Sequence, residues 1–204
     1  GLYASILGGV QQNVSGQNSA TLGGRNNTVS GFGSSASGLY NTVTGYLSFI
    51  GGGGYYSRVD ADLSSIVGGC CNRVIDNFAI IGGGENNYIC SGGRYGFIGG
   101  GKNHCATGVF SSVVGGCGNQ ANGYASFVGG GINNCMTANN SIIGGGVCNW
   151  DFTGSEVNVI VGGQGNRICN TGVYVFKARN FIGGGINNTI SGGYVNTIAG
   201  GTGN

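Results

Sequence analysis

Two adjacent apolar residues followed by glycine recur along the whole chain, usually 13 to 18 residues apart and once 21 residues apart. The apolar residues are rich in β-branched side chains, and glycines bound each run, so each copy predicts a strand of about five residues. Helices are disfavoured, because each glycine would cost about 0.5–1 kcal/mol in a helix interior. The glycines that mark the units are Gly8, Gly23, Gly38, Gly51, Gly68, Gly82, Gly99, Gly115, Gly129, Gly144, Gly162, Gly183 and Gly200.

A polar position, usually asparagine, follows four residues after the marker glycine. Stacked amides can donate to the residue above and accept from the residue below, which stabilises parallel strands that lie in register. We therefore predict an asparagine ladder along the chain. Its members are Asn27, Asn72, Asn86, Asn103, Asn119, Asn133, Asn166 and Asn187.

A second apolar position lies two residues beyond the ladder, as at Val14, Val29 and Val74, and predicts a second short strand in each unit. Two strands and two glycine-rich corners per unit describe a narrow coil. The predicted fold is all-β, a parallel β-solenoid (β-roll) of about 13 short two-strand coils. The repeat continues through residues 1–204 without a linker, so we expect a single domain.

The two apolar residues before each marker glycine cannot share one core, because successive side chains of a strand point to opposite faces. One of them fills the coil, and the other faces outward. We expect an apolar stripe along the outside of the rod, and stripes of that size mark interfaces. The stripe predicts a bundle of parallel copies and includes Phe49, Phe97, Phe127 and Phe181.

The composition removes several other classes of protein. The chain has 49 glycines but no proline, and glycine does not fall at every third position, so it is not collagen. Regularly spaced hydrophobic residues, 40% of the total, argue against disorder. A net charge of +2 gives no basic patch for nucleic acid. No run of 18 apolar residues occurs, so we expect no membrane span.

Copies of the unit such as 46–52, Tyr-Leu-Ser-Phe-Ile-Gly-Gly, and 119–123, Asn-Gln-Ala-Asn-Gly, resemble the head repeats of trimeric autotransporter adhesins, the YadA-like heads. They are equally similar to the Gly-Asn-rich repeats of phage and large-virus tail fibres. The resemblance covers the whole chain and implies a left-handed roll, a homotrimer and binding to host surfaces. The coils here are often longer than the family's unit, and eight cysteines are unusual for it.

The eight cysteines form no C-x-x-C pair, and the lone His104 completes no familiar zinc spacing. Cys90 and Cys105 lie on adjacent predicted coils and are the best candidates for a disulfide. The alternatives are small apolar core residues, disulfides between chains or a metal site. Of the glycosylation sequons, Asn139 lies in a predicted loop and is the plausible acceptor.

One histidine and six scattered acidic residues provide no catalytic constellation, so we expect no enzyme and no cofactor. Ligand contacts are expected from irregular coils, where aromatic residues accompany charged ones. The alternative is that these loops are tolerated insertions or pack between chains. The candidate residues are Tyr55, Tyr56, Arg58, Trp150, Asp151, Tyr174, Phe176, Lys177 and Arg179.

These observations favour a rigid, non-catalytic fibre on a cell or virion surface, used for attachment or projection. Its expected partners are further copies of itself and a host glycan or protein. A purely structural filament that polymerises end to end, without a specific ligand, is the alternative.

Overall fold

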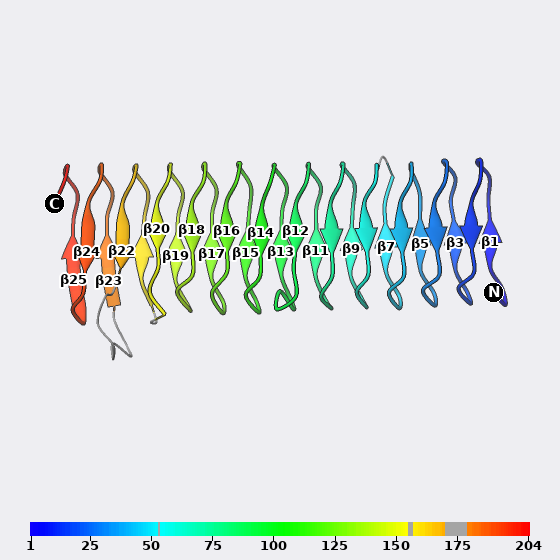
Figure 1. Cartoon of the computed structure of the whole chain (residues 1–204), viewed down its shortest axis with the longest axis horizontal. Coiled ribbons are helices and arrows are strands. Elements are labelled where there is room, and N and C mark those ends of the chain that lie inside the picture. The colour runs from blue at the N-terminus through cyan, green and yellow to red at the C-terminus, as the bar shows by residue number, and fades with distance from the viewer. Residues whose placement is uncertain (53, 155–156, 170–178) are drawn as a thin grey trace.

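The short apolar runs form strands that pair in parallel, coil upon coil, along the full length of the rod (Figure 1). The computed structural model describes residues 1–52, 54–154, 157–169 and 179–204. These residues form an all-β parallel β-solenoid of about 12 turns, without helices. The predicted solenoid is therefore confirmed. Each turn contributes one strand to each of two sheets.

The first sheet has 13 strands and the second has 12, and every strand pairs with the next strand of its own sheet. The first sheet consists of β1 (Ser5–Ile6), β3 (Ala20–Thr21), β5 (Ser35–Ala36), β7 (Phe49–Ile50), β9 (Ser65–Ile66), β11 (Ile80–Ile81), β13 (Phe97–Ile98), β15 (Ser112–Val113), β17 (Phe127–Val128), β19 (Ile142–Ile143), β21 (Val159–Ile160), β23 (Arg179–Ile182) and β25 (Val195–Ile198).

The second sheet consists of β2 (Asn13–Val14), β4 (Thr28–Val29), β6 (Thr42–Val43), β8 (Arg58–Val59), β10 (Arg73–Val74), β12 (Tyr88–Ile89), β14 (Cys105–Ala106), β16 (Gln120–Ala121), β18 (Cys135–Met136), β20 (Trp150–Asp151), β22 (Arg167–Cys169) and β24 (Thr189–Ser191).

A third line of pairing, which the sequence did not predict, runs along one corner of the rod. One residue per coil forms a parallel bridge to its equivalent in the next coil, from the pair Val10 and Arg25 to the pair Ile186 and Thr202. Each coil is thus tied to its neighbours along three lines, so its backbone groups are paired without any contact to distant coils.

The core is a narrow double column of side chains between the two sheets. The first sheet contributes residues such as Ile66, Ile81 and Ile98, and the second contributes residues such as Val74 and Ile89, all of them fully buried. Because the strands are so short, only one side chain per strand reaches this space. The interior therefore holds about two side chains per turn, most of them apolar, and is built by repetition.

The register of the apolar pairs differs from the prediction. Ile66 pairs with Ile81, although Ile66 lies two residues before its marker glycine and Ile81 lies directly before its own. The residue that precedes the marker glycine is consequently buried in some coils and exposed in others, such as Val67. Runs of two glycines in some units and three in others cause this shift of one residue.

One corner of a typical coil contains two residues with positive φ, such as Gly116 and Gly118, and the other contains one, such as Ala125. This backbone conformation favours glycine and asparagine. A glycine is also required where neighbouring coils approach each other closely. At Gly116, which has a φ of 92°, an added Cβ would lie 2.1 Å from the carbonyl oxygen of Gly131 in the next coil. The regular glycines therefore permit the coils to stack.

Candidate interaction surfaces

The asparagine ladder exists, and it is buried along one corner of the rod. Asn119 shows the pattern, since its Nδ2 donates to the carbonyls of Gly115 (2.8 Å) and Gly131 (3.0 Å). Its Oδ1 accepts from the backbone N–H of Asn134 at 2.9 Å. Each amide thus satisfies backbone groups of two coils. The buried asparagines at this position are Asn27, Asn41, Asn72, Asn87, Asn119, Asn134, Asn149, Asn166 and Asn188.

Four of the eight predicted ladder members lie one residue before the position that the ladder occupies in the structure. Asn86, Asn103, Asn133 and Asn187 have φ angles of 54° to 59° and stand at the surface of the corner. They are asparagines because this residue type tolerates the left-handed conformation. Their neighbours one residue further on face the interior. The predicted members Asn27, Asn72, Asn119 and Asn166 are placed correctly.

His104 takes the place of an asparagine in the ladder, which the sequence did not reveal. Its Nδ1 accepts from the backbone N–H of Asn119 at 3.0 Å, and the backbone N–H of His104 donates to Asn87 Oδ1 at 3.0 Å. Burial lowers the pKa of the imidazole, although backbone hydrogen bonds to Gly116 and Asn119 oppose that effect. The histidine is therefore a neutral structural side chain. Its position three residues after the last glycine of a run, Gly101, was the signal, since Asn119 and Asn134 follow Gly116 and Gly131 at the same distance.

The predicted apolar stripe lies on the outer face of the first sheet. Phe49, Phe97, Phe127 and Phe181 all point outward and keep 36–40% of their surface exposed. Ile80 and Ile142 occupy the same position in other coils and are exposed to a similar degree. The outward direction of the four phenylalanines is as predicted, whereas nothing in a single chain tests which molecule covers them.

Bulky and small residues compensate each other across this outer face. In the coils that have Phe49, Phe97, Phe127 or Phe181, the residue two positions later is glycine. A Cβ added to those glycines would lie 3.1–3.4 Å from the phenylalanine ring. Coils that start with a small residue, such as Ser65 or Ser112, instead carry valine two positions later. In most coils the bulky group therefore lies at one of two outward positions, which form two parallel lines along the face.

All eight cysteines are free thiols outside the buried apolar core, so the interpretation of the cysteines as core residues is wrong. The Sγ atoms of Cys90 and Cys105, on adjacent coils, are 3.5 Å apart. Burial and the hydrogen bond with Cys90 raise the pKa of the Cys105 thiol to about 12. Among the residues that the structure describes, no three histidine, cysteine or acidic side chains cluster as metal ligands would.

Tyr55 and Tyr56, two predicted ligand residues, form an exposed aromatic cluster with Tyr40. The rings of Tyr40 and Tyr56 stack at 4.8 Å, and Tyr55 meets Tyr56 edge-on at 4.6 Å. Since the partners lie on neighbouring coils, the cluster reinforces the corner of the rod. These rings contact each other and also remain accessible to a partner.

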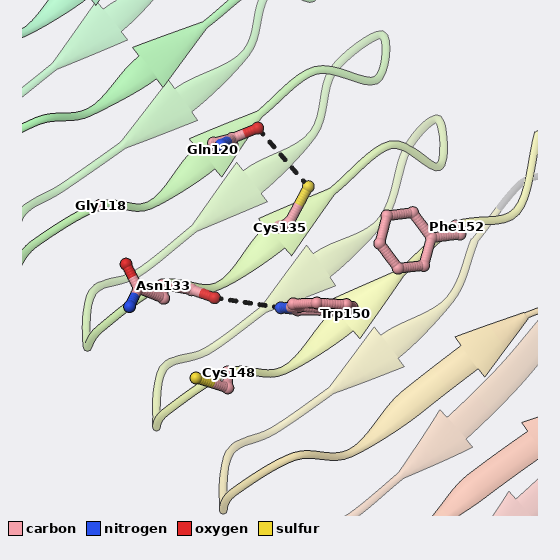
Figure 2. Close-up of a pocket in the computed structure, with 7 residues that line it drawn as sticks. All are labelled: Gly118, Gln120, Asn133, Cys135, Cys148, Trp150 and Phe152. Carbon is pink, nitrogen blue, oxygen red and sulfur yellow. Dashed lines mark hydrogen bonds between the residues drawn. The ribbon is translucent and has the colours of Figure 1, made fainter.

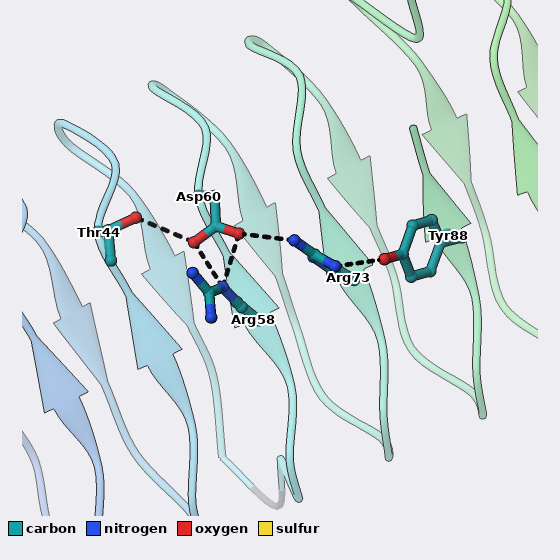
Figure 3. Close-up of polar contacts among 5 residues, drawn as sticks. All are labelled: Thr44, Arg58, Asp60, Arg73 and Tyr88. Carbon is teal, nitrogen blue, oxygen red and sulfur yellow. Dashed lines mark hydrogen bonds and ion pairs between the residues drawn. The ribbon is translucent and has the colours of Figure 1, made fainter. Parts of the chain in front are cut away.

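Arg58, the third candidate in that region, belongs to a chain of polar contacts across four consecutive coils (Figure 3). Its Nε donates to both oxygens of Asp60, at 2.7 and 2.6 Å, and Asp60 also accepts from Thr44 at 3.0 Å. Arg73 connects Asp60 (3.3 Å) to the hydroxyl of Tyr88 (2.6 Å). The side chain of Arg58 is thus engaged within the rod, where an exposed pair contributes about 0–1 kcal/mol.

Trp150 and Phe152 line a hollow on the outer face of the second sheet (Figure 2). Their rings meet edge-on at 5.2 Å, and the Trp150 Nε1 donates to the backbone oxygen of Asn133 at 3.2 Å. Asp151, which we expected to face a ligand, instead points into the core and is fully buried. The correction follows from strand alternation, because Asp151 lies between two outward-facing residues.

The remaining candidates fall partly outside the described part of the chain. Tyr174, Phe176 and Lys177 lie outside the described residues, and Arg179 begins β23 as an exposed residue. Asn139, the glycosylation candidate, is half-buried, and its Oδ1 accepts from the backbone N–H of Tyr124 at 2.8 Å.

The fold and these surfaces define a β-solenoid repeat protein. Comparison with protein-family models and with the sequences of curated proteins gives no match. Within its described residues, the chain has no helix that is long and apolar enough to span a membrane.

Proposed function

We propose that the chain is a rigid, non-catalytic rod that projects from a cell or virion surface and serves attachment. The observation that carries the proposal is the apolar outer face of the first sheet, which runs along the solenoid and leaves large side chains exposed in most coils. Contiguous apolar surface of this extent is rare on monomers and marks interfaces. The proposed covering partners are parallel copies of the same chain.

The relief of this face supports self-association over association with an unrelated partner. The bulky residues recur with the spacing of the coils, about 4.8 Å. Only a surface with the same repeat can match them along the whole rod, and a second copy of the chain has that repeat by construction. Burying one phenylalanine contributes roughly 2 kcal/mol, and the gain accumulates over many coils. The resemblance to trimeric adhesin heads suggests three copies of a left-handed roll.

The chemistry of the described residues also supports a non-catalytic role. The single histidine, His104, is part of the ladder, where its Nδ1 accepts a hydrogen bond from the backbone of Asn119 and burial lowers its pKa. Of the acidic residues, Asp60 is paired with arginines and Glu85 with Lys102. A surface rod has no need of a reacting group, and its function lies in reach, stiffness and contact area.

Sedimentation of the purified chain tests the proposal. We expect a discrete species of three chains, and the double substitution of Phe97→Asp and Phe127→Asp should convert it to a single chain that keeps its β-sheet circular dichroism. The matched control is Phe32→Asp, because Phe32 is as exposed (38%) but lies at a corner position that is aspartate in another coil, at Asp62. This control should remain trimeric.

Two results contradict the proposal. A well-behaved single chain at micromolar concentration would mean that the apolar face has no self-partner. Open-ended polymers of increasing length, insensitive to the double substitution, would favour the structural filament that polymerises through its ends.

A further inference from the structure

The hollow beside Trp150 has the size and lining of a small-molecule site. It encloses about 420 Å³, which lies in the range of about 300–1,000 Å³ typical of ligand pockets. It spans three adjacent coils of the second sheet, because β16, β18 and β20 pair in that order. Figure 2 shows Gln120, Cys135 and Trp150 side by side on these three strands.

Small residues on the earlier coils create the hollow. Gly118 has a φ of 68° at a corner where an added Cβ would lie 2.1 Å from Asn133 Oδ1. Cys135 lies on the next coil and Cys148 on the coil of Trp150 itself, and both are small lining residues. The indole of Trp150 and the ring of Phe152 then form the wall at the far end. The site is thus an aromatic wall facing a floor of small side chains.

The polar groups of the lining are amides. Gln120 Oε1 accepts from Asn122 Nδ2 at 3.3 Å and from Cys135 Sγ at 3.7 Å. The NH2 group of Gln120 donates to no group in the part of the chain that the structure describes. The side chain of Asn133 has no hydrogen-bond partner among the described residues either, since its recorded bonds use the backbone alone: its N–H donates to Cys117 and its oxygen accepts from Trp150. Both amides can therefore bind a ligand without breaking a contact.

The lining contains no acidic or basic side chain. The nearest cation that the structure records at the tryptophan is Arg167, whose Cζ lies 5.5 Å from the centre of the indole. Arg167 belongs to β22, on the coil beyond Trp150, whereas the hollow extends over the preceding coils. It stiffens the indole by a cation–π contact, and the site itself remains neutral.

We propose that this hollow binds a neutral pyranose unit of a surface oligosaccharide. An aromatic ring that is exposed on one face stacks on the C–H face of a sugar, and adjacent amides donate to and accept from its hydroxyls. Trp150 is the stacking residue, and Gln120 and Asn133 are the hydroxyl-binding residues. The inference rests on the proposed attachment function, to which it adds a class of ligand.

The direction of the site supports an oligosaccharide over a single sugar. The three coils repeat at about 4.8 Å along the axis. One pyranose unit of an extended chain advances by a similar length, so successive sugars can lie over successive strands. A lipid chain or an apolar peptide would leave both amides unpaired in the bound state, which is unfavourable.

Trp150 is the only tryptophan in the chain, so intrinsic fluorescence reports directly on the hollow. Cellobiose, lactose, maltose and N,N′-diacetylchitobiose serve as neutral probes, and 3′-sialyllactose as an acidic one. We expect at least one neutral disaccharide to shift the emission saturably and to protect the indole from iodide quenching. The acidic probe should bind no more tightly than lactose, since the lining contains no cation.

The substitution Gln120→Ala should weaken binding about tenfold, the effect of one lost hydrogen bond of roughly 1.4 kcal/mol. Its matched control is Thr42→Ala, at the equivalent outward position several coils away, which should leave the titration unchanged. The inference is overturned if none of the neutral probes alters the fluorescence at millimolar concentration. It is also overturned if Gln120→Ala binds as tightly as the unsubstituted chain.

The fluorescence result can be separated from the oligomeric state. The hollow lies on the second sheet and the apolar stripe on the first, so the titration can be repeated on the double variant of Phe97 and Phe127. If the chain forms a trimer but binds no sugar, only the proposed sugar site is contradicted. If the chain binds sugar but never self-associates, the proposed assembly is contradicted and the sugar site is supported.

Discussion

Asparagine has two separate physical roles in this chain, and both lie at the same corner of the coil. In the pair formed by Asn133 and Asn134, the first has a φ of 54° at the surface, and the second is fully buried in the ladder. The first role depends on backbone conformation and the second on the amide. A substitution by glycine is therefore compatible with the backbone at Asn133 but removes four side-chain hydrogen bonds at Asn134.

Asp151 is the residue least suited to its surroundings. It stands in the core column of the second sheet, where it pairs with Met136 and Ile168. Its Oδ1 accepts from Thr153 (2.7 Å) and Asn158 (3.3 Å), while its Oδ2 is without a partner in the described structure. Burial raises the pKa of this carboxyl to about 6, although the hydrogen bonds from Thr153 and Asn158 oppose that effect.

We predict that Asp151→Asn stabilises the rod at pH 7 and not at pH 4. The folded-state pKa of about 6 lies above the unfolded value of 3.8, so the folded state binds the proton more tightly. The unsubstituted chain has no penalty from this carboxyl below about pH 4, where the group is protonated in both states. The penalty grows as the pH rises through about 6 and is complete above it. The difference between the two pKa values corresponds to a loss of ~3 kcal/mol in the free energy of unfolding at pH 7. The amide of asparagine does not ionise and avoids this loss.

Thermal unfolding midpoints of the two proteins between pH 4 and pH 8 provide the measurement. The two curves should diverge as the pH rises. His104 is present in both proteins, so its lowered pKa, which reduces stability as the pH falls, cancels from the comparison. Parallel curves over the whole range would contradict the buried-carboxylate explanation.

The buried position of Asp151 could have been predicted from the sequence. Trp150, Asp151 and Phe152 alternate as outward, inward and outward residues of a strand, the pattern that Arg73, Val74 and Ile75 show in another coil. The error arose because aromatic and charged residues together were interpreted as a loop. Strand periodicity was the stronger physical constraint, since it is imposed by the coils on both sides.

At the scale of the strands, the sequence predicted their existence but not their register. The strands are mostly two residues long, and the apolar run that signals each one is longer than the part that pairs. Ile66 pairs with Ile81, so the next residues, Val67 and Gly82, occupy equivalent positions in their coils. An alignment of the coils on the first glycine therefore displaced some of them by one residue. Only the pairing of neighbouring coils reveals which apolar side chain is enclosed.

The outer face of the first sheet follows a rule that emerges only from the corrected register. A large residue before the buried position is accompanied by glycine after it, as at Phe127 and Gly129. The ring of Phe127 lies over Gly129 and fills the space that a side chain at this position would need. The rule has exceptions, because one coil has small residues at both outward positions, Ser35 and Ser37, and another has valine at both, Val159 and Val161.

The second sheet has one pair of thiols that are placed for oxidation. Cys90 follows β12 and Cys105 begins β14, 15 residues apart and with Sγ atoms at 3.5 Å. A disulfide needs a separation of about 2.05 Å, a movement that side-chain rotation can provide. Oxidised glutathione would accept the two electrons, the two thiols would lose their protons, and an S–S bond would join adjacent coils.

We predict that this disulfide forms slowly and raises the thermal midpoint. The reaction needs a thiolate, and the pKa of Cys105 near 12 keeps that fraction small at neutral pH, so the rate should increase with pH. Closing a loop of this size adds about 3 kcal/mol in the chain-entropy description. Peptide mass spectrometry after proteolysis under non-reducing conditions should identify the linked peptides.

The substitution Cys90→Ser should abolish both the linked peptide and the gain in thermal midpoint. Cys135→Ser is the matched control, because Cys135 lies on the same face but its recorded hydrogen bond is to Gln120. A linkage that involves Cys135 in preference to Cys90 would contradict the pairing of Cys90 with Cys105.

At the scale of the whole molecule, every coil depends on its two neighbours alone. Each strand pairs with the previous and the next strand of its own sheet, and the ladder amides connect successive coils. The free energy of unfolding is then approximately a sum of coil terms and neighbour terms. No coil in the middle of the rod is structurally indispensable, provided that its removal keeps the remaining columns in line.

Removal of one complete coil tests this description. Deletion of residues 112–126 joins Ser111 to Phe127 and brings Phe97 opposite Phe127 and Cys105 opposite Cys135, since each of these pairs already occupies equivalent positions. The core columns and the ladder continue across the junction, with His104 followed by Asn134. We expect a folded rod with unchanged circular dichroism per residue, shortened by about 4.8 Å.

Deletion of residues 112–119 is the contrasting variant, because it removes β15 and a corner but keeps β16. A half coil leaves β13 and β17 without the strand that pairs with both, and the backbone groups of two coils lose their partners. Its thermal midpoint should fall far below that of the longer deletion, although fewer residues are lost. If the two deletions destabilised the rod equally, stability would depend on chain length or on distant contacts, and neighbour-to-neighbour stacking could not be the principle that holds this molecule together.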